Sequence, residues 1–374
     1  MKWSLKLGSV RGIGVYVHWT FLLLIPFVAA IQYQPDLAHA EQFMRLLHGL
    51  VFVLAIFACV LLHEFGHALT AQRVGVGTRD ITLLPIGGIA RLERIPNNPR
   101  HEFYITIMGP MVNVVIAAVL LGAILLARVN PFDVEGLSGG NFFARLMWVN
   151  VILVVFNMLP AFPMDGGRIL RSVLAMRLEY AQATEIAARV GQAMAILFGV
   201  LGLLAGNVLL MLIAVFVFLG AEAESQAAKM RSSFRGLNAS DAMMTNVITL
   251  APEDTLERAA QELLDGAQQE FPVLENDAVV GVLRRAELFK ALREDGLGAS
   301  VRSAMRTGCP HIAPDEALER IHERMQQAGC SALPVVQDGR LLGMVSLENV
   351  GELVMIRSAL RDAEPPRHAK ATAE

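Results

Sequence analysis

Charged residues are scarce in this chain of 374 residues. Asp, Glu, Lys and Arg together make up 18% of the sequence, whereas hydrophobic residues make up 54%. Soluble globular proteins carry about 25% charged residues. The shortage excludes a protein that is soluble along its whole length and predicts a membrane protein, at least in part. The formal net charge of −3 gives no reason to expect a nucleic acid as a partner.

Cysteine is scarce as well. The chain has three, Cys59, Cys309 and Cys330, and they form no cluster with the spacing of a metal site. Two of them lie in the charged C-terminal segment, which the pattern of basic residues places in the reducing cytoplasm. We therefore predict neither a disulfide nor a thiolate metal site.

Long uncharged runs identify candidate membrane spans. A helix needs about 20 apolar residues to cross a hydrocarbon core of about 30 Å. The last run has 32 residues and its helix would be about 48 Å long, so we predict a turn near its middle, at Gly206-Asn207. This makes six transmembrane helices. The five runs are Ile13–Ile31, Gly49–Leu62, Phe103–Ala127, Leu146–Met164 and Val190–Ala221.

Connections that contain Lys and Arg alternate with connections that lack them. Residues 32–44, residues 130–141 and the turn at 206–207 contain neither. Because basic residues collect on the cytoplasmic side, the alternation predicts that both termini are cytoplasmic. The first span lacks a small-residue cleavage site, so we expect it to be retained. The basic connections carry Lys2, Lys6 and Arg11; Arg73, Arg79, Arg91, Arg94 and Arg100; Arg168, Arg171 and Arg177; and Lys229, Arg231 and Arg235.

A metal-ligand motif, His63-Glu64-Phe65-Gly66-His67, follows directly on the second run. Residues four apart on a helix point to one side, so the two imidazoles can share a metal ion, with Glu64 beside the water that the metal holds. Packing alone is a weak alternative explanation. Ionisable residues inside a membrane are costly and therefore indicate a functional site.

Asp165 is the candidate for a third ligand, because a catalytic zinc usually takes three protein ligands. Prolines precede it and paired glycines follow it, and these are predicted to break the helix of the fourth span and let the carboxylate turn inward. Spans two and four run in the same direction. His63, His67 and Asp165 are therefore expected in one leaflet, towards the cytoplasm. The alternative is a surface aspartate that ends a helix.

Two asparagines lie within apolar spans. Asn113 and Asn157 could bond to the backbone of a substrate or to an oxyanion, or they could join helices to one another. Both interpretations stay open. The pair Gly109-Pro110 is predicted to be a kink or a close-packing site rather than part of the chemistry.

The sequence changes character near Ala221. We predict a linker over residues 224–238, and from Ala239 the pattern is that of alternating helices and strands. An internal repeat is present there, because Met243 and Met305, Pro272 and Pro334, and Gly281 and Gly343 are each separated by 62 residues. The predicted repeats cover residues 239–299 and 300–360, and residues 361–374 are predicted to be a disordered tail.

This repeat resembles a tandem pair of cystathionine-β-synthase (CBS) domains. In that family a Ser or Thr, and an Asp or Asn three residues later, commonly hold the ribose of an adenine nucleotide. The resemblance implies that Ser346 and Asn349 bind ATP or AMP as a regulatory ligand. The first repeat has Arg284 and Glu287 at the matching positions, which favours one nucleotide site over two. The alternative is a module that dimerises without a ligand.

The membrane half, residues 1–223, resembles the site-2 protease family of intramembrane zinc metalloproteases, peptidase family M50. The resemblance rests on the histidine motif, on Gly87-Gly88, on Gly109 to Asn113 and on Asn157 to Gly167. It implies that His63, His67 and Asp165 bind one Zn²⁺ and that Glu64 is the general base. It also implies that the segment Thr78–Ile95 is a re-entrant β-hairpin, and such a hairpin could pair with an extended substrate. The alternative is a surface hairpin that only joins spans two and three. The candidate substrate-positioning residues are Gly87, Gly88, Asn113 and Asn157.

Together these patterns predict a multi-pass α-helical membrane protein with six transmembrane helices and a re-entrant β-hairpin, followed by a soluble α/β tandem CBS domain. The resemblance to the site-2 protease family implies hydrolysis of peptide bonds in or near the transmembrane segment of a single-span membrane protein, such as an anti-sigma factor. We expect a cell-membrane location, cytoplasmic CBS domains and a homodimer or higher oligomer formed through them. The alternative is a CBS-regulated channel or transporter, which needs polar residues along several spans rather than at one depth.

Overall fold

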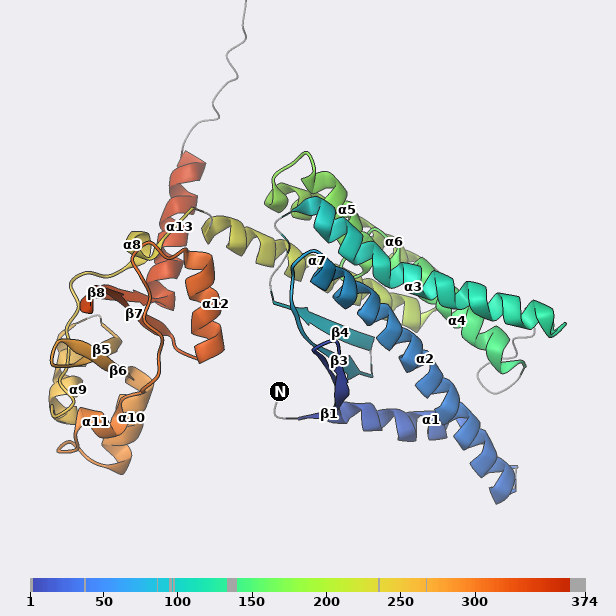
Figure 1. Cartoon of the computed structure of the whole chain (residues 1–374), viewed down its shortest axis with the longest axis horizontal. Coiled ribbons are helices and arrows are strands. Elements are labelled where there is room, and N and C mark those ends of the chain that lie inside the picture. The colour runs from blue at the N-terminus through green and yellow to red at the C-terminus, as the bar shows by residue number, and fades with distance from the viewer. Residues whose placement is uncertain are drawn as a thin grey trace, which may run out of the picture. The chain divides into compact units, whose positions relative to one another are not determined.

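The computed structural model describes residues 3–36, 38–85, 87–93, 96, 98–132, 140–234, 236–266 and 268–363. The chain forms two compact units, Met1–Ala228 and Lys229–Glu374, and each is described by itself. Figure 1 shows the first unit as a set of long helices with a small sheet, and the second as two similar groups of strands and helices.

Four of the described helices are long and apolar enough to cross a membrane. The other two predicted crossings fall on shorter apolar helices, Trp19–Gln32 and α4 (Phe142–Asn157). The predicted turn at Gly206-Asn207 is confirmed, since it separates the last two long helices and Gly206 has a φ of +62°. The four long helices are α2 (His39–Arg73), α3 (Pro99–Leu126), α6 (Tyr180–Leu204) and α7 (Val208–Phe234).

The first predicted span was wrong over its first third. Residues Ile13–His18 form the strand β2, and the helical part that follows consists of a 3₁₀ turn, Trp19–Leu23, and α1 (Leu24–Gln32). The sequence of β2 contains Val15, Tyr16 and Val17. β-Branched and aromatic residues favour strands, and a short apolar run of this kind cannot be told from a helix by hydropathy alone.

A mixed sheet of four strands occupies the first unit. Its order is β1 (Ser4–Val10), β2, β3 (Thr78–Leu84), β4 (Gly87–Leu92), with β2 and β3 parallel and the other pairs antiparallel. The two strands predicted around the glycines are therefore confirmed, and β4 is an edge strand. Figure 1 shows β3 and β4 beside α2. Ile13 and Ile81 pack with Ala68 of that helix.

The fourth predicted span ends earlier than expected. Helix α4 stops at Asn157, and α5 (Asp165–Ala175) begins after an irregular segment that contains the prolines. The paired glycines were predicted to break a helix. They instead form the first turn of α5. A Cβ on Gly166 would lie 2.1 Å from the carbonyl oxygen of Leu159, and one on Gly167 would lie 2.6 Å from the carbonyl carbon of Ala161. Only glycine allows this turn to pack so closely on the preceding segment.

The second unit contains the two repeats. Phe271 pairs with Leu283 in the first, and Leu333 with Val345 in the second, at the same register. The segment that enters each repeat bridges to a strand of the other, since Met244 pairs with Met344 and Arg306 with Val282. The described elements are α8 (Ala239–Ala242), α9 (Leu256–Asp265), β5 (Glu270–Glu275), β6 (Ala278–Arg284), α10 (Arg285–Glu294), α11 (Val301–Ala304), α12 (Leu318–Ala328), β7 (Ala332–Gln337), β8 (Arg340–Ser346) and α13 (Leu347–Ala363).

Two predicted boundaries differ from the structure. Helix α7 continues to Phe234, so most of the predicted linker 224–238 is helical, and Phe234 belongs to the hydrophobic core of the second unit. Helix α13 reaches Ala363, which is inside the predicted tail. The rest of that tail, residues 364–374, lies outside the described residues.

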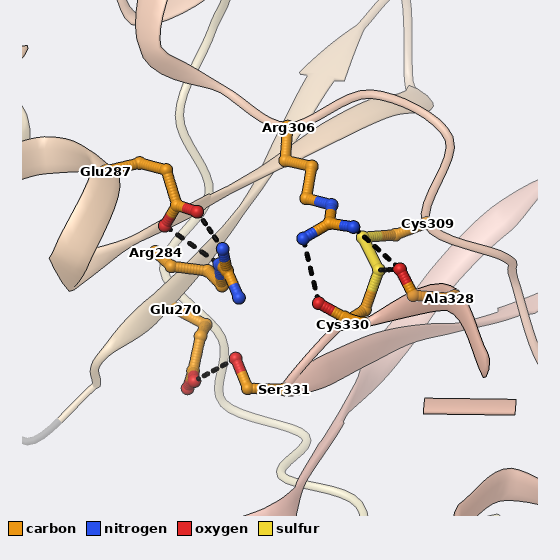
Figure 2. The surroundings of a disulfide bond; sticks show 9 residues. Glu270, Arg284, Glu287, Arg306, Cys309, Ala328, Cys330 and Ser331 are labelled. Atoms are coloured by element: carbon orange, nitrogen blue, oxygen red, sulfur yellow. Dashed lines mark hydrogen bonds and ion pairs between the residues drawn. A yellow bond between two sulfur atoms is a disulfide. The ribbon is translucent and has the colours of Figure 1, made fainter. Parts of the chain in front are cut away.

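A disulfide joins Cys309 to Cys330 in the second repeat, with 6.2 Å between their Cα atoms, and Cys59 is free. This corrects the prediction that no disulfide forms. The two cysteines are 21 residues apart, and only the fold brings them together. Figure 2 shows Arg306 beside the bond, where its guanidinium donates to the carbonyl oxygens of Ala328 and Gly329 at the end of α12.

The disulfide predicts a specific labelling pattern. Thiol alkylation of the unfolded chain without reductant should modify Cys59 alone, and alkylation after reduction should modify all three cysteines, as read by mass spectrometry. Closing a loop of this length should contribute about 3 kcal/mol to the stability of the second unit. The double variant Cys309→Ser/Cys330→Ser should therefore unfold more readily than the oxidised parent, yet match the reduced parent. Full labelling without reductant would contradict the disulfide.

Candidate metal centre

Helix α2 presents His63 and His67 to Asp165, the first residue of α5. The Nε2 atoms of the two histidines are 3.1 Å apart, and each lies 3.2 Å from Oδ2 of Asp165. Among the described residues these three form a group with the geometry to hold a metal ion. A tetrahedral zinc with ligands about 2.0–2.1 Å away separates its ligand atoms by about 3.3 Å. The three donors therefore match a zinc site to within a few tenths of an ångström.

The hydrogen bonds of the imidazoles show which nitrogen atoms are available. Nδ1 of His67 lies 2.8 Å from the carbonyl oxygen of Ile105, and Nδ1 of His63 lies 3.0 Å from Oδ1 of Asn113. Both partners are acceptors, so Nδ1 carries the proton in each ring and Nε2 is left with a lone pair. Two lone pairs and a carboxylate oxygen would repel one another at these distances. A bound cation resolves that repulsion, so the donor set fits Zn²⁺.

Asn113 therefore contacts a candidate metal ligand, His63. Its side chain is buried, at 1% exposure, and its oxygen faces His63. Such an outer partner orients a ligating imidazole and fixes its tautomer. Asn157 is half-buried at the end of α4, and among the described residues its side chain has no hydrogen bond. The structure therefore brings one of the two asparagines to the centre and does not show a comparable contact for the other.

Gly109 of α3 packs directly on the two histidines. A Cβ at this position would lie 2.1 Å from Nε2 of His67 and 2.8 Å from Nε2 of His63. The sequence indicated a kink or close packing here, and the packing turns out to be against the candidate ligands themselves. One signal could have revealed this. Gly66 lies within the histidine motif and packs against α3 in the same way. A Cβ added at Gly66 would lie 2.6 Å from the carbonyl oxygen of Met108.

Glu64 lies next to the β-hairpin. It is partly exposed, unlike its buried neighbour His63. A Cβ on Gly88 would lie 2.6 Å from Cγ of Glu64, whereas a Cβ on Gly87 would meet nothing within 4 Å. The start of β4 therefore reaches the carboxylate that the motif supplies. Of the two predicted glycines, Gly88 makes the contact, and Gly87, with a φ of +142°, provides the turn into the strand.

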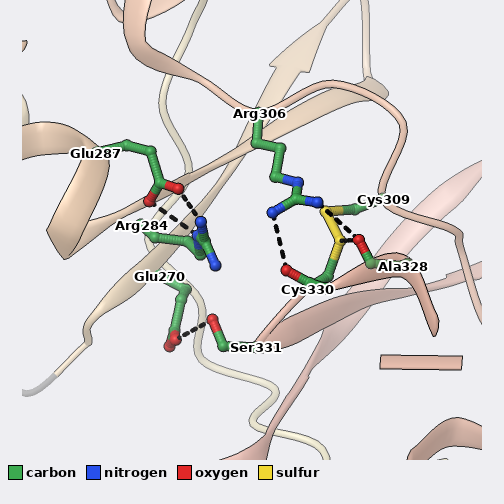
Figure 3. A network of polar contacts seen from close by, with 9 residues as sticks. Glu270, Arg284, Glu287, Arg306, Cys309, Ala328, Cys330 and Ser331 are labelled. Atoms are coloured by element: carbon green, nitrogen blue, oxygen red, sulfur yellow. Dashed lines mark hydrogen bonds and ion pairs between the residues drawn. A yellow bond between two sulfur atoms is a disulfide. The ribbon is translucent and has the colours of Figure 1, made fainter. Parts of the chain in front are cut away.

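In the second unit, the two repeats differ at the positions that matter for a nucleotide. Oγ of Ser346 donates to Oδ1 of Asn349 at 2.6 Å and accepts from its backbone N–H. At the matching positions of the first repeat, Arg284 forms a two-pronged ion pair with Glu287, which Figure 3 shows beside the Glu270–Ser331 hydrogen bond between the repeats. Burial lowers the pKa of the Arg284 guanidinium, and the nearby Arg306 lowers it further.

Comparison with known proteins identifies both units. The family model for peptidase family M50 matches residues 51–135 and 133–198, and the model for the CBS domain matches 239–294 and 301–354. The chain is 32% identical to the zinc metalloprotease MJ0392 of Methanocaldococcus jannaschii, over 94% of this chain and 96% of that protein. It is 28% identical to a Synechocystis protein, sll0528, that is named as a zinc metalloprotease, over 94% of this chain and 95% of that one.

A solved structure is similar as well. The site-2 protease from Methanocaldococcus jannaschii is 36% identical and covers 60% of this chain and 95% of its own, with a TM-score of 0.44. The fold and the histidine motif with its aspartate define a membrane metallopeptidase. The chain belongs to peptidase family M50. It is a multi-pass, site-2-type intramembrane zinc metalloprotease that carries a C-terminal pair of CBS domains.

The space that Gly109 leaves open should be necessary for metal binding. A methyl group in Gly109→Ala would occupy the position of the imidazole nitrogens, so we expect zinc affinity to fall by more than about 100-fold, the upper end of the effects seen for outer partners. The matched control is Gly122→Ala on the same helix, where a Cβ meets nothing within 4 Å. Equal zinc content in the two purified variants, measured by mass spectrometry, would contradict this role.

Proposed function

We propose that His63, His67 and Asp165 hold one Zn²⁺ and that Glu64 is the general base for hydrolysis of a peptide bond in or near a membrane. The observation that carries the proposal is the triangle of three donor atoms with sides of 3.1 and 3.2 Å. When bound, the metal supplies a water of lowered pKa and polarises the scissile carbonyl.

The protein's own residues would then perform the proton transfers. Glu64 takes one proton from the attacking water while the water oxygen bonds to the carbonyl carbon. Glu64 then delivers that proton to the leaving amine as the C–N bond breaks. The Nδ1 partners, Asn113 and Ile105, keep both imidazoles in one orientation throughout. Burial of His63 and Asp165, which are 7% and 9% exposed, limits the entry of bulk water.

We propose further that the substrate binds as an extended strand along β4. A helical substrate hides its carbonyl groups in its own hydrogen bonds, so it must unwind before attack. The described sheet leaves one edge of β4 unpaired, and an edge strand offers hydrogen bonds to a peptide. Because Gly88 at the start of β4 lies against Glu64, a strand paired there would have its backbone close to the general base.

The topology and the partners are part of the same proposal. The short helices Trp19–Gln32 and α4 would complete six crossings, and the alternation of basic residues favours the cytoplasmic side for both termini, the CBS pair and the metal centre. The turn at Gly206-Asn207, which that alternation requires, supports this orientation. The Cys309–Cys330 disulfide opposes a reducing compartment for the CBS pair, so the charge pattern and the disulfide favour different compartments for that unit. The substrate would be a single-span membrane protein such as an anti-sigma factor, and the CBS pair would join chains into a homodimer or larger assembly.

Glu64→Gln separates metal binding from chemistry. The amide is nearly isosteric but cannot accept the proton, so we expect one zinc per chain and a loss of at least about 100-fold in cleavage of a reconstituted single-span substrate. Asp165→Ala, by contrast, should lose the metal as well. Cleavage by Glu64→Gln at the parent's rate would remove Glu64 from the role of base.

We also propose that ATP or AMP regulates the enzyme through the second repeat alone. Ser346 and Asn349 have the residue types that hold a ribose, whereas the matching positions of the first repeat carry an arginine and a glutamate joined as an ion pair. Calorimetric titration of the full chain should therefore give one nucleotide per chain. Asn349→Leu should abolish that binding and Arg284→Met should leave it. Two equivalent sites, or no binding at millimolar nucleotide, would contradict the proposal.

A further inference from the structure

A buried ionic cluster lies within the first unit and does not include the three candidate metal ligands. Arg171 of α5 donates from Nε, at 3.0 Å, and from Nη2 to Oε1 of Glu102 on α3, and from Nη1 to Oε2 of Glu224 on α7, also at 3.0 Å. Its guanidinium lies 5.1 Å from the centre of the Phe162 ring and 5.0 Å from that of Tyr180. The side chains of Arg171 and Glu102 are only 4% and 7% exposed.

This cluster connects the two segments that assemble the metal centre. On α3, Glu102 lies one helical turn before Ile105, and the carbonyl oxygen of Ile105 accepts a hydrogen bond from His67. Gly109 lies one turn after Ile105 and packs against both imidazoles. Asp165 is the first residue of α5, and Arg171 lies six residues on, about 9 Å along the helix axis. The Glu102–Arg171 pair therefore holds the helix that carries the carboxylate against the helix that orients the histidines.

The packing of helix α5 sets the position of Asp165. The helix has 11 residues, and its N-cap, Met164, makes no side-chain hydrogen bond. Within the described residues, the hydrogen-bond and ion-pair partners of the Asp165 carboxylate are the two imidazoles. Its position is therefore set by how α5 packs. Helix α5 packs against α3 and α6, with Leu170 on the apolar cluster around Phe162. Gly166 and Gly167 pack closely on the preceding segment, and the fork of Arg171 onto its two carboxylates adds the polar contacts of this helix with α3 and α7.

Stability alone does not account for such a cluster. Replacement of a buried ion pair by apolar residues of similar volume is often neutral or stabilising, so a guanidinium between two carboxylates is better explained by the geometry that it imposes. Arginine suits this purpose, because its planar fork bonds carboxylates in a fixed orientation that a lysine cannot reproduce.

We infer that Arg171 is a positioning residue of the metal centre: by binding Glu102 and Glu224 it sets the position of α5 so that Asp165 completes the triangle with His63 and His67. This inference rests on the proposed ligand set. Loss of an outer partner of a metal ligand typically costs about 10–100-fold in metal affinity, and we expect a loss in that range here.

The test compares Arg171→Lys with Arg168→Lys, an exposed arginine on the same helix. Full-length protein in detergent is titrated with Zn²⁺ against a chromophoric chelator, and the visible spectrum of the Co²⁺-loaded protein reports the ligand geometry. Arg171→Lys should raise the Kd for zinc about 10–100-fold and alter the Co²⁺ spectrum, whereas Arg168→Lys should change neither. Identical Kd values and spectra in the two variants would overturn the inference.

A second variant covers the case in which Arg171→Lys does not fold. Glu102→Met/Arg171→Met removes the pair together and leaves no fully buried charge unpaired, since Glu224 is 30% exposed. It should unfold at a temperature close to that of the parent yet bind zinc about 10–100-fold more weakly. A parent-like Kd in this folded variant would overturn the inference.

Asp165→Ala, measured in parallel, separates this inference from the ligand assignment on which it rests. If Asp165→Ala binds zinc as the parent does, the assignment itself is wrong and the inference falls with it. If Asp165→Ala loses zinc while both Arg171 variants bind it normally, the ligand set stands and only the positioning role is refuted.

Discussion

The close approach of α3 to α2 is the constraint on which the metal centre depends. Two glycines, Gly66 on α2 and Gly109 on α3, let the helices touch where any side chain would collide with backbone or imidazole. Once in contact, α3 supplies the acceptor for each Nδ1, from Ile105 and Asn113. Both Nε2 lone pairs then face the same point. Small residues at helix interfaces allow such approach in membranes, where no hydrophobic force drives helices together.

Around this contact, two other elements complete the site from different sides. The short helix α5 brings Asp165 to the imidazoles, held by its glycine turn and by the Arg171 cluster. The start of β4 reaches Glu64 through Gly88. The donors, the base and an unpaired strand edge thus lie together. That combination suits the proposed cleavage of a peptide that is held as an extended strand.

The C-terminal unit is symmetric in its backbone and asymmetric in its polar residues. Each repeat pairs its strands at the same register and bridges to the other. Yet Ser346 and Asn349 bond to each other in one repeat, while the corresponding Arg284 and Glu287 form an ion pair in the other. The disulfide between Cys309 and Cys330 is also confined to the second repeat. The two halves therefore share a fold and differ in the chemistry of their polar side chains.

Much of the molecule could be predicted from local sequence. The repeat of 62 residues is visible when the sequence is compared with itself. The spacing of His63 and His67, the strands around Gly87 and Gly88 and the turn at Gly206-Asn207 follow from motif spacing or backbone preference, which act over a few residues. The error at Ile13–His18 has the same origin. A short apolar run has similar hydropathy whether it becomes a strand or a helix, and its pairing with β3 involves residues more than 60 positions away.

What the sequence by itself determined is which side chains are the candidates for the chemistry, and that His63, Glu64 and His67 lie on one helix. Only the tertiary structure decided which distant atoms meet: Gly109 against the imidazoles, Asn113 on His63, Arg171 between Glu102 and Glu224, and Cys309 with Cys330. The physical reason is that these contacts depend on how helices and loops pack, over distances of ångströms that no local pattern specifies. A glycine, an asparagine or a buried arginine has the same local signal whether or not it serves a metal.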